Sequence, residues 1–311
     1  MCAVTGSVML IDSAGLWFRS YYALPESLTA PDGTPVNSVR GFCDMLAKLI
    51  GERRPTRVVA CLDNDWRPQF RVDALPSYKA HRVAEADPDA EEVPDTLGPQ
   101  IPIILDVLDA LGVATAEAEG YEADDVIGVL AERETTDPVE VVTGDRDLFQ
   151  LVRPAPTPVR VRYVGAGLAK AQDFGPDELA ERYALDPARA GEAYAEMAVL
   201  RGDPSDGLPG VAGIGEKTAA KLITEFGSLA ALLAASEQGD RRLTPRVRGK
   251  LADAADYLAA APAVVRVVRD APVVLDRPDT APAAPADPDR LAELGTRWGL
   301  GGPLDRLIAA L

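Results

Sequence analysis

The stretch GYEADDVIGVLAERETTDPVEVVTGDRDLFQ, residues 120–150, decides the fold of this chain. Five of its carboxylates form two groups: Glu122, Asp124 and Asp125, then Asp145 and Asp147. The first group opens an apolar segment with helical spacing, and the second follows the run 139–143, which is typical of a buried strand. Taken alone, each group also fits an ordinary helix start or turn.

Further acids follow strand-like runs in the same way. The apolar residues 8–11 end at Asp12, and the run 57–62 ends at Asp63. In open α/β sheets ligands bind beyond the carboxyl ends of the strands, so we expect these acids to share a crevice with Asp145 and Asp147. Carboxylates about 4 Å apart repel by roughly 4 kcal/mol near a protein surface, which calls for a cation between them. Oxygen ligands without His or Cys favour Mg²⁺ or Mn²⁺.

Composition limits the class of protein. The chain has 311 residues, 47% of them hydrophobic, which predicts one large domain and a smaller one. Three cysteines without metal-ligand spacing argue against a zinc site or a disulfide framework. We find no basic leader and no apolar run of membrane-spanning length, so we expect a soluble cytoplasmic protein with no membrane partner. The net charge of −17 argues against a nucleic-acid partner unless the basic residues cluster.

The basic residues do cluster. Residues 66–82 interleave basic side chains with aromatic ones, namely Arg67, Arg71, Lys79, His81 and Arg82 with Trp66, Phe70 and Tyr78. This pattern suits a phosphate backbone with a stacked base, and equally a solvated surface. Residues 241–250 hold five bases and no acid. Between them, the acidic, proline-bearing segment 85–99 predicts poor order rather than a packed element.

The segment 208–223, LPGVAGIGEKTAAKLI, predicts a tight hairpin that leads into a helix. Its glycines allow the backbone to approach a ligand closely, and the free amides of the helix that begins at Glu216 can hold a phosphate oxygen. Lys217 and Lys221 share one face of that helix. This helix-hairpin-helix pattern grips the DNA backbone without reading bases. Two more acids, Asp203 and Asp206, lie in the turn before it.

In this order the motifs resemble the 5′ nuclease family, which comprises flap endonucleases and the 5′-to-3′ exonuclease domains of bacterial DNA polymerase I. The resemblance covers about residues 7–275. It implies an α/β fold with a mostly parallel central sheet flanked by helices, a helical arch and a C-terminal helical region. The implied divisions are a nuclease core at 1–185 with the arch at 66–100, the helix-hairpin-helix region at 186–275, and a linker and helix at 276–311 that pack back on the core. The chain departs from the family at Gly207, where Asn is usual, and in its acidic arch.

The resemblance also implies an activity: metal-dependent 5′-3′ exonuclease and structure-specific 5′ flap endonuclease action on DNA in replication and repair. Because no polymerase domain is present, we expect a stand-alone, monomeric nuclease with DNA as its partner. It would use two or three Mg²⁺ or Mn²⁺ ions, with K⁺ at the hairpin.

The resemblance assigns roles to particular residues. The implied metal ligands are Asp12, Asp63, Glu122, Asp124, Asp125, Asp145, Asp147, Asp203 and Asp206. The implied catalytic residues are Arg19, Arg71, Tyr78 and Lys79, where Arg71 and Lys79 neutralise the scissile phosphate and Tyr78 stacks on a displaced base. Main-chain oxygens would bind K⁺ at Leu200, Arg201, Pro209, Val211 and Ile214. The implied DNA contacts are Arg82, Gly213, Gly215, Lys217, Thr218 and Lys221.

Two other functions fit parts of the sequence. A non-catalytic, structure-specific DNA-binding protein would keep the hairpin but lack some of the acids, and every expected acid is present. A metal-dependent ribonuclease on a similar α/β core would keep the acids. The hairpin and Lys221 favour duplex DNA over RNA.

Overall fold

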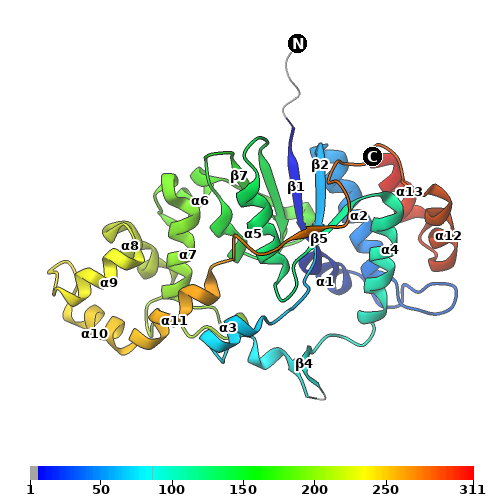
Figure 1. The fold of residues 1–311 in the computed structure, drawn as a ribbon. Coiled ribbons are helices and arrows are strands. Elements are labelled where there is room, and N and C mark those ends of the chain that lie inside the picture. The colour runs from blue at the N-terminus through cyan, green and yellow to red at the C-terminus, as the bar shows by residue number, and fades with distance from the viewer. Residues whose placement is uncertain (1–5, 86) are drawn as a thin grey trace, which may run out of the picture.

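A seven-stranded sheet forms the centre of the molecule, in the order β8-β7-β6-β1-β2-β5-β9 (Figure 1). The computed structural model describes residues 6–85 and 87–311. Neighbouring strands from β7 to β5 pair in parallel, and both edge strands are antiparallel. The strands of this sheet are β1 (Val8–Asp12), β2 (Arg57–Cys61), β5 (Ala114–Glu117), β6 (Val139–Thr143), β7 (Val159–Tyr163), β8 (Gln172–Phe174) and β9 (Val274–Leu275). The predicted α/β fold class is confirmed.

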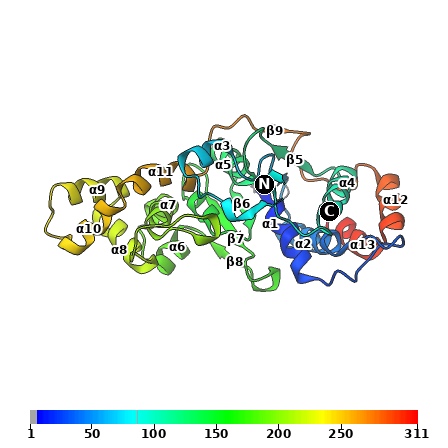
Figure 2. The ribbon, with the colours of Figure 1, turned by 90° about the horizontal axis from the view of Figure 1, so that it is seen from below.

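Helices cover both faces of the sheet, as a parallel sheet requires (Figure 2). The side chains of β1 alternate: Val8 and Leu10 pack into the core beside α5 and α7, whereas Met9 and Ile11 pack against α1, α2 and α4. The helices of the first two thirds of the chain are α1 (Ser13–Ala23), α2 (Asn37–Arg53), α3 (Gln69–Ala74), α4 (Ile101–Leu111), α5 (Ala123–Arg133), α6 (Pro176–Tyr183) and α7 (Ala190–Arg201).

The strands predicted to end at acids are neighbours in space. β1 lies between β2 and β6, and Asp12 is paired with Cys61 at the end of β2. The carboxyl ends of the three strands therefore meet at one edge of the sheet. This adjacency brings together acids that are more than a hundred residues apart in sequence.

The segment 66–100 leaves this edge and returns to it. It contains α3, two short 3₁₀ turns and an antiparallel pair, β3 (Val83–Ala84) with β4 (Asp87–Glu91). The acidic stretch was expected to form no packed element, yet it forms one strand of this pair, and Glu91 forms an ion pair with Arg82. Residue 86 lies outside the described residues.

The C-terminal helices occupy the two ends of the molecule (Figure 1). One end holds α8 (Glu216–Phe226), α9 (Leu229–Glu237), α10 (Pro245–Asp253) and α11 (Ala255–Val265). The tail was expected to contain a single helix, but it forms two, α12 (Pro288–Trp298) and α13 (Gly301–Ala310), which pack against α4 and α2.

No single helix in the described residues is long and apolar enough to span a membrane; only the bent pair α8–α9 reaches that length and composition, when counted together. Cys43 and Cys61 are buried and free, and Cys2 lies outside the described residues.

Candidate active site

A cavity of about 850 Å³ opens at the carboxyl ends of β1, β2 and β6. Five of the predicted metal ligands line it: Asp12, Asp63, Glu122, Asp124 and Asp145. Three basic residues also line it: Arg19, Lys79 and Arg82. An apolar wall that sequence reasoning missed, formed by Phe18, Tyr22, Met45 and Leu168, completes the cavity.

Local hydrogen bonds fix the acids at the strand ends. Asp12 caps α1, accepting from the Gly15 amide at 2.8 Å, and its other oxygen accepts from the Thr143 hydroxyl at 2.7 Å. The same hydroxyl accepts from the Asp145 amide at 2.9 Å. Asp63 accepts from the amide of Ala123 at 2.7 Å and so joins the end of β2 to the start of α5. Thr143, which sequence reasoning also missed, thus connects the acid of β1 to the acid that follows β6.

The electrostatics of the cavity disfavour bare carboxylates. Burial raises the pKa of Asp12 and Asp124, and the negative charge of Asp145 adds to both shifts. Asp63 is open to solvent within the cavity but closely surrounded by protein; desolvation, with Glu122 and Asp12, raises its pKa to about 7. Among the described residues, no hydrogen bond reaches the Asp124 carboxylate. A cation would relieve this repulsion.

Three other predicted metal ligands, Asp147, Asp203 and Asp206, lie beside the cavity. Burial raises the pKa of Asp147, and the charges of Asp145, Asp206 and Asp203 raise it further. Asp206 is also desolvated, which raises its pKa, although Lys79 and Arg82 oppose the shift. These acids therefore form a group around Asp145 that does not line the cavity itself.

The donor set fits a hard divalent ion, since the acids offer only oxygen ligands. However, within residues 6–85 and 87–311 no three acidic, His or Cys side chains are close enough to hold an ion as they stand. The structure thus brings the acids to one place, but their side chains are not arranged as a complete metal-coordination site.

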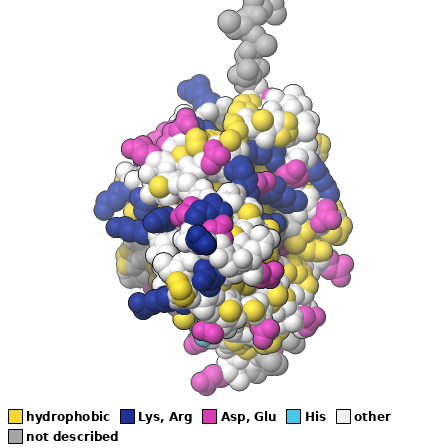
Figure 3. Space-filling view, turned by 90° about the vertical axis from the view of Figure 1, so that its left-hand side faces the viewer, with side chains coloured by type: hydrophobic (Ala, Val, Ile, Leu, Met, Phe, Trp, Pro, Cys, Tyr) yellow, Lys and Arg dark blue, Asp and Glu magenta, His cyan; other side chains and the backbone are white. Residues whose placement is uncertain are grey.

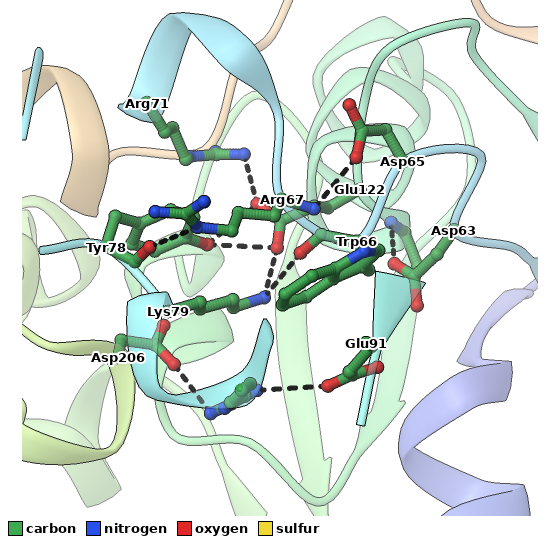
Figure 4. A network of polar contacts seen from close by, with 12 residues as sticks. Asp63, Asp65, Trp66, Arg67, Arg71, Tyr78, Lys79, Glu91, Glu122 and Asp206 are labelled. Atoms are coloured by element: carbon green, nitrogen blue, oxygen red, sulfur yellow. Dashed lines mark hydrogen bonds and ion pairs between the residues drawn. The ribbon is translucent and has the colours of Figure 1, made fainter. Parts of the chain in front are cut away.

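Glu122 is the centre of a buried polar network (Figure 4). Arg71 and Lys79 both donate to its carboxylate, and the Tyr78 hydroxyl donates to it at 2.8 Å. Although burial favours the neutral amine, Glu122 raises the pKa of Lys79 well above its usual value. Lys79 is therefore held as a cation at the cavity wall.

The structure corrects three predicted roles in this network. Arg71 is 2% exposed and donates to Asp125 at 2.6 and 2.7 Å and to the Val264 carbonyl at 3.1 Å, so it cannot reach a phosphate in the cavity. Asp125 is fully buried, faces Arg71 and accepts from the Val268 amide at 2.7 Å, so it is not placed as a metal ligand. Tyr78 is 4% exposed, so its ring is not available to stack on a base.

The other basic residues also have intramolecular partners. Arg19 donates to the carbonyls of Gly165, at 2.5 Å, and Gly144, at 2.9 Å, so it fastens α1 to the loops after β6 and β7. Arg82 donates to the carboxylate of Asp206 at 2.8 Å and to the Ser205 carbonyl at 2.7 Å. Both still line the cavity.

The predicted hairpin lies between α7 and α8. The Leu200 carbonyl accepts from Val211 and the Val211 carbonyl from Ile214, both at 2.9 Å, so two of the five predicted K⁺ oxygens also hold the loop together. At Gly210, where φ is +66°, a Cβ would overlap the Arg201 carbonyl, which only glycine avoids. A Cβ at Gly215 would meet open space, so the start of α8 is accessible. Lys217, Thr218 and Lys221 are exposed on α8.

Two family models match the chain along most of its length. "5'-3' exonuclease, N-terminal resolvase-like domain" matches residues 7–184, and "5'-3' exonuclease, C-terminal SAM fold" matches residues 190–289. The chain belongs to the 5′-3′ exonuclease family. As a member of this nuclease family it is a hydrolase that acts on DNA.

Similar proteins include two that are named 5'-3' exonuclease. The 5'-3' exonuclease of Mycobacterium tuberculosis is 57% identical, over 98% of this chain and 97% of the relative. The 5'-3' exonuclease of Streptomyces coelicolor is 55% identical, over 97% of this chain and 99% of the relative. DNA polymerase I of Mycobacterium tuberculosis is 40% identical over 93% of this chain, which spans 30% of that polymerase.

Solved nucleases share the fold of this exonuclease at low identity. A bacteriophage T5 flap endonuclease in complex with DNA and metal ions aligns with a TM-score of 0.64 and 17% identity, over 97% of this chain and 99% of that one. The catalytic core of Rad2 with a DNA substrate aligns with a TM-score of 0.62 and 18% identity, over 99% of this chain and 94% of that one.

Proposed function

We propose that this chain is a divalent-metal-dependent nuclease that removes nucleotides from the 5′ ends of DNA and also cuts 5′ flaps. The observation that carries the proposal is the gathering of Asp12, Asp63, Glu122, Asp124 and Asp145 around one cavity that Lys79 also lines. The exonuclease name of the two most similar relatives given above supports the first activity, and the flap endonuclease name of the T5 protein is consistent with the second.

The proposed metal ligands are those acids that face the cavity or lie beside it. Asp12, Asp63 and Asp124 would hold one ion, and Asp145, Asp147 and Asp206 a second, with Glu122 and Asp203 orienting waters. Bound divalent ions would activate a water for attack on the phosphodiester and stabilise the leaving 3′ oxygen. Asp125 is not included, because its carboxylate is already bound by Arg71.

The basic residues of the cavity would act on the substrate phosphate. Lys79 keeps its proton because Glu122 raises its pKa, so it offers a permanent positive charge where negative charge develops. Arg82 would contact the strand as it enters, exchanging part of its bond to Asp206. Arg19 would act by holding the loops that carry Asp145 in place, through its bonds to main-chain carbonyls.

The C-terminal half would bind the duplex. We propose that the hairpin carbonyls of Leu200, Arg201, Pro209, Val211 and Ile214 hold K⁺ against a DNA phosphate. The open start of α8 and its two exposed lysines would hold the neighbouring backbone. We further propose that the chain acts as a monomer, with its nuclease core ending near residue 185 and its helix-hairpin-helix region near residue 275.

The decisive test uses 5′-labelled flap, nicked and single-stranded DNA with Mg²⁺, Mn²⁺ or chelator. We expect cleavage of flap and nicked substrates with either ion and none with chelator. Asp124→Asn should lower the cleavage rate by more than about 100-fold, since even outer-sphere partners of metal ligands contribute 10–100-fold. It should leave DNA binding in chelator intact, because no described hydrogen bond depends on Asp124.

The matched control is Asp305→Asn, which removes the same charge from an exposed position on α13. Its cleavage should equal that of the unchanged protein. Full turnover by Asp124→Asn, or cleavage that persists in chelator, would contradict the proposal. Faster cleavage of a matched RNA flap than of the DNA flap would instead support the ribonuclease alternative.

A further inference from the structure

The segment 240–250, which comprises the turn before α10 and most of that helix, carries a basic surface that the proposed hairpin contacts do not include. The helices at this end of the molecule display groups of Lys and Arg side chains (Figure 3). Within this segment, the ten residues 241–250 hold five bases and no acid, which is unusual in a protein with a net charge of −17 and calls for a local explanation.

Three of these five basic side chains form contacts that stabilise the local structure. Arg242 pairs with Asp240 at 2.7 Å and lies over the ring of Phe226, 4.3 Å from its centroid. Arg248 donates to the Asp240 and Leu243 carbonyls at 3.1 and 2.6 Å, which fastens the turn before α10. The Lys250 ammonium donates to the Gly213 carbonyl at 2.7 Å and thereby ties α10 to the hairpin.

The other two basic side chains form no such contacts within the described residues. Arg241 and Arg246 are exposed, and neither side chain forms an ion pair or hydrogen bond with the described part of the chain. Arg246 lies in the first turn of α10, which contains no acid. A positive charge there opposes the helix dipole by roughly 0.3–1 kcal/mol, so helix stability does not account for it. Residues that break a local rule without structural gain are often functional.

The surrounding contacts hold both side chains on a rigid support. Thr244 caps α10 through the Val247 amide at 3.3 Å, and Leu243 and Leu251 are buried beneath the segment. The bond from Lys250 to Gly213 places this support directly beside the hairpin, whose far side leads into α8 with its exposed lysines. The two basic surfaces therefore flank the same loop.

We propose that Arg241 and Arg246 bind the phosphate backbone of duplex DNA beyond the stretch held by the hairpin and α8. The surface that contacts the duplex would then extend onto α10. The inference rests on the proposed function for its ligand. It assigns no base recognition, since two exposed guanidinium groups on backbone phosphates carry charge but no sequence information.

Salt dependence of duplex binding provides the test, with affinity measured in chelator so that no cleavage occurs. Two lost phosphate contacts reduce the slope of log affinity against log salt by about 1.8. Between 50 and 200 mM salt, the unchanged protein should therefore lose about 12-fold more affinity than the Arg241→Gln, Arg246→Gln double variant. The Lys counterparts, Arg241→Lys with Arg246→Lys, should restore the slope because they keep the charge.

The control, Lys48→Gln with Arg54→Gln, removes the same charge from α2 and the turn after it, at the opposite edge of the sheet from the cavity. Its salt slope should be unchanged. Stepwise shortening of the duplex should abolish the difference between the double variant and the unchanged protein once the duplex no longer reaches α10. An unchanged slope in the double variant, or an equal change in the control, would overturn the inference.

Cleavage separates this inference from the proposed function. The double variant should raise KM on long duplexes and leave kcat unchanged, because it touches no residue of the cavity. If the unchanged protein cleaves flaps with Mg²⁺ but the double variant keeps its salt slope, only the role of α10 is wrong. If the unchanged protein does not cleave, the proposed function fails whatever the slope.

Discussion

Asp125 shows how one carboxylate of an acidic cluster can take a structural role. It is fully buried against Arg71, whose side chain is 3% exposed, and it also accepts main-chain amides from Glu122 and Val268. Breaking a buried ion pair by removing one partner leaves an uncompensated charge and costs roughly 3–5 kcal/mol. We therefore expect Asp125→Ala to lower the free energy of unfolding by about that amount, measured by denaturant titration.

The double variant Asp125→Ala, Arg71→Met should lose less stability than the sum of the two single variants, because the second change removes the stranded charge. Asp124→Asn, one residue away, serves as the control and should lose no stability, since the charge that it removes is itself unfavourable in the fold. Normal stability of Asp125→Ala together with loss of metal-dependent cleavage would return Asp125 to the role of a metal ligand.

The residue types of the site could be predicted, but their partners could not. Glu122, Asp124 and Asp125 stand together in the sequence, and nothing local distinguishes them. The fold distinguishes them, because α5 directs Asp125 toward Arg71 on α3 and leaves Asp124 at the cavity. The same holds for Tyr78, whose basic and aromatic neighbours suggested an exposed base-stacking surface, whereas Glu122 binds its hydroxyl in the interior. Burial is a property of packing between distant segments.

At the scale of elements, the first half of the 66–100 segment contacts the turn before the hairpin. The Lys79 amide donates to the Asp206 carbonyl at 3.0 Å, and the Ser77 hydroxyl donates to the Gly207 carbonyl at 2.8 Å. Gly207 has a φ of +74°, and a Cβ there would overlap the Ser77 carbonyl oxygen. The departure from the usual Asn of the family thus coincides with a close backbone contact beside Lys79, the proposed phosphate-binding lysine.

Gly207→Ala should therefore lower both stability and the rate of flap cleavage, since the contact that positions Lys79 must open. The matched control is Gly239→Ala, where φ is +72° but an added Cβ meets nothing within 4 Å. The control should lose only the cost of a left-handed backbone, about 1 kcal/mol. Equal losses of stability in the two variants, with cleavage unchanged in both, would show that the contact with Ser77 is unimportant.

Sequence patterns predicted the elements that carry the site and missed those at the margins. β1, β2 and β6 are apolar runs that stop at or just before an acid, and all three could be recognised. β8 and β9 are edge strands of three and two residues, too short to show any alternation. The sequence does carry a signal for the division of the tail into α12 and α13, since Gly299 ends α12 in the left-handed conformation with φ of +64°.

For the whole molecule, the distribution of charge matters more than its sum. The acids that give the chain its net charge of −17 include the cluster at the sheet edge, while unpaired bases lie on α8 and α10. The sequence revealed this separation only as clusters along the chain. The sheet order gathers acids of distant segments around one cavity, and the bond between Lys250 and Gly213 places the basic residues of α10 beside the hairpin.

The acid cluster should make the stability of the whole metal-free protein depend on pH. The pKa of Asp63, about 7 when folded, lies above its ordinary value of 3.8, so the folded state holds the proton more tightly than the unfolded state. Its ionised form therefore destabilises the fold above pH 7, and stability is recovered as pH falls through 7 toward 4. Asp12, Asp124 and Asp147, whose pKa values are also raised, act in the same direction.

We therefore expect the Tm of the protein in chelator to rise as the pH is lowered from 8 to about 5.5. Asp63→Asn should make this rise smaller, whereas Asp305→Asn should leave it unchanged. Adding Mg²⁺ at pH 8 should raise Tm more than adding it at pH 5.5, because protons and metal compete for the same oxygens. A Tm in chelator that falls as the pH is lowered over this range would show that the ionised acids of the cluster do not destabilise the fold.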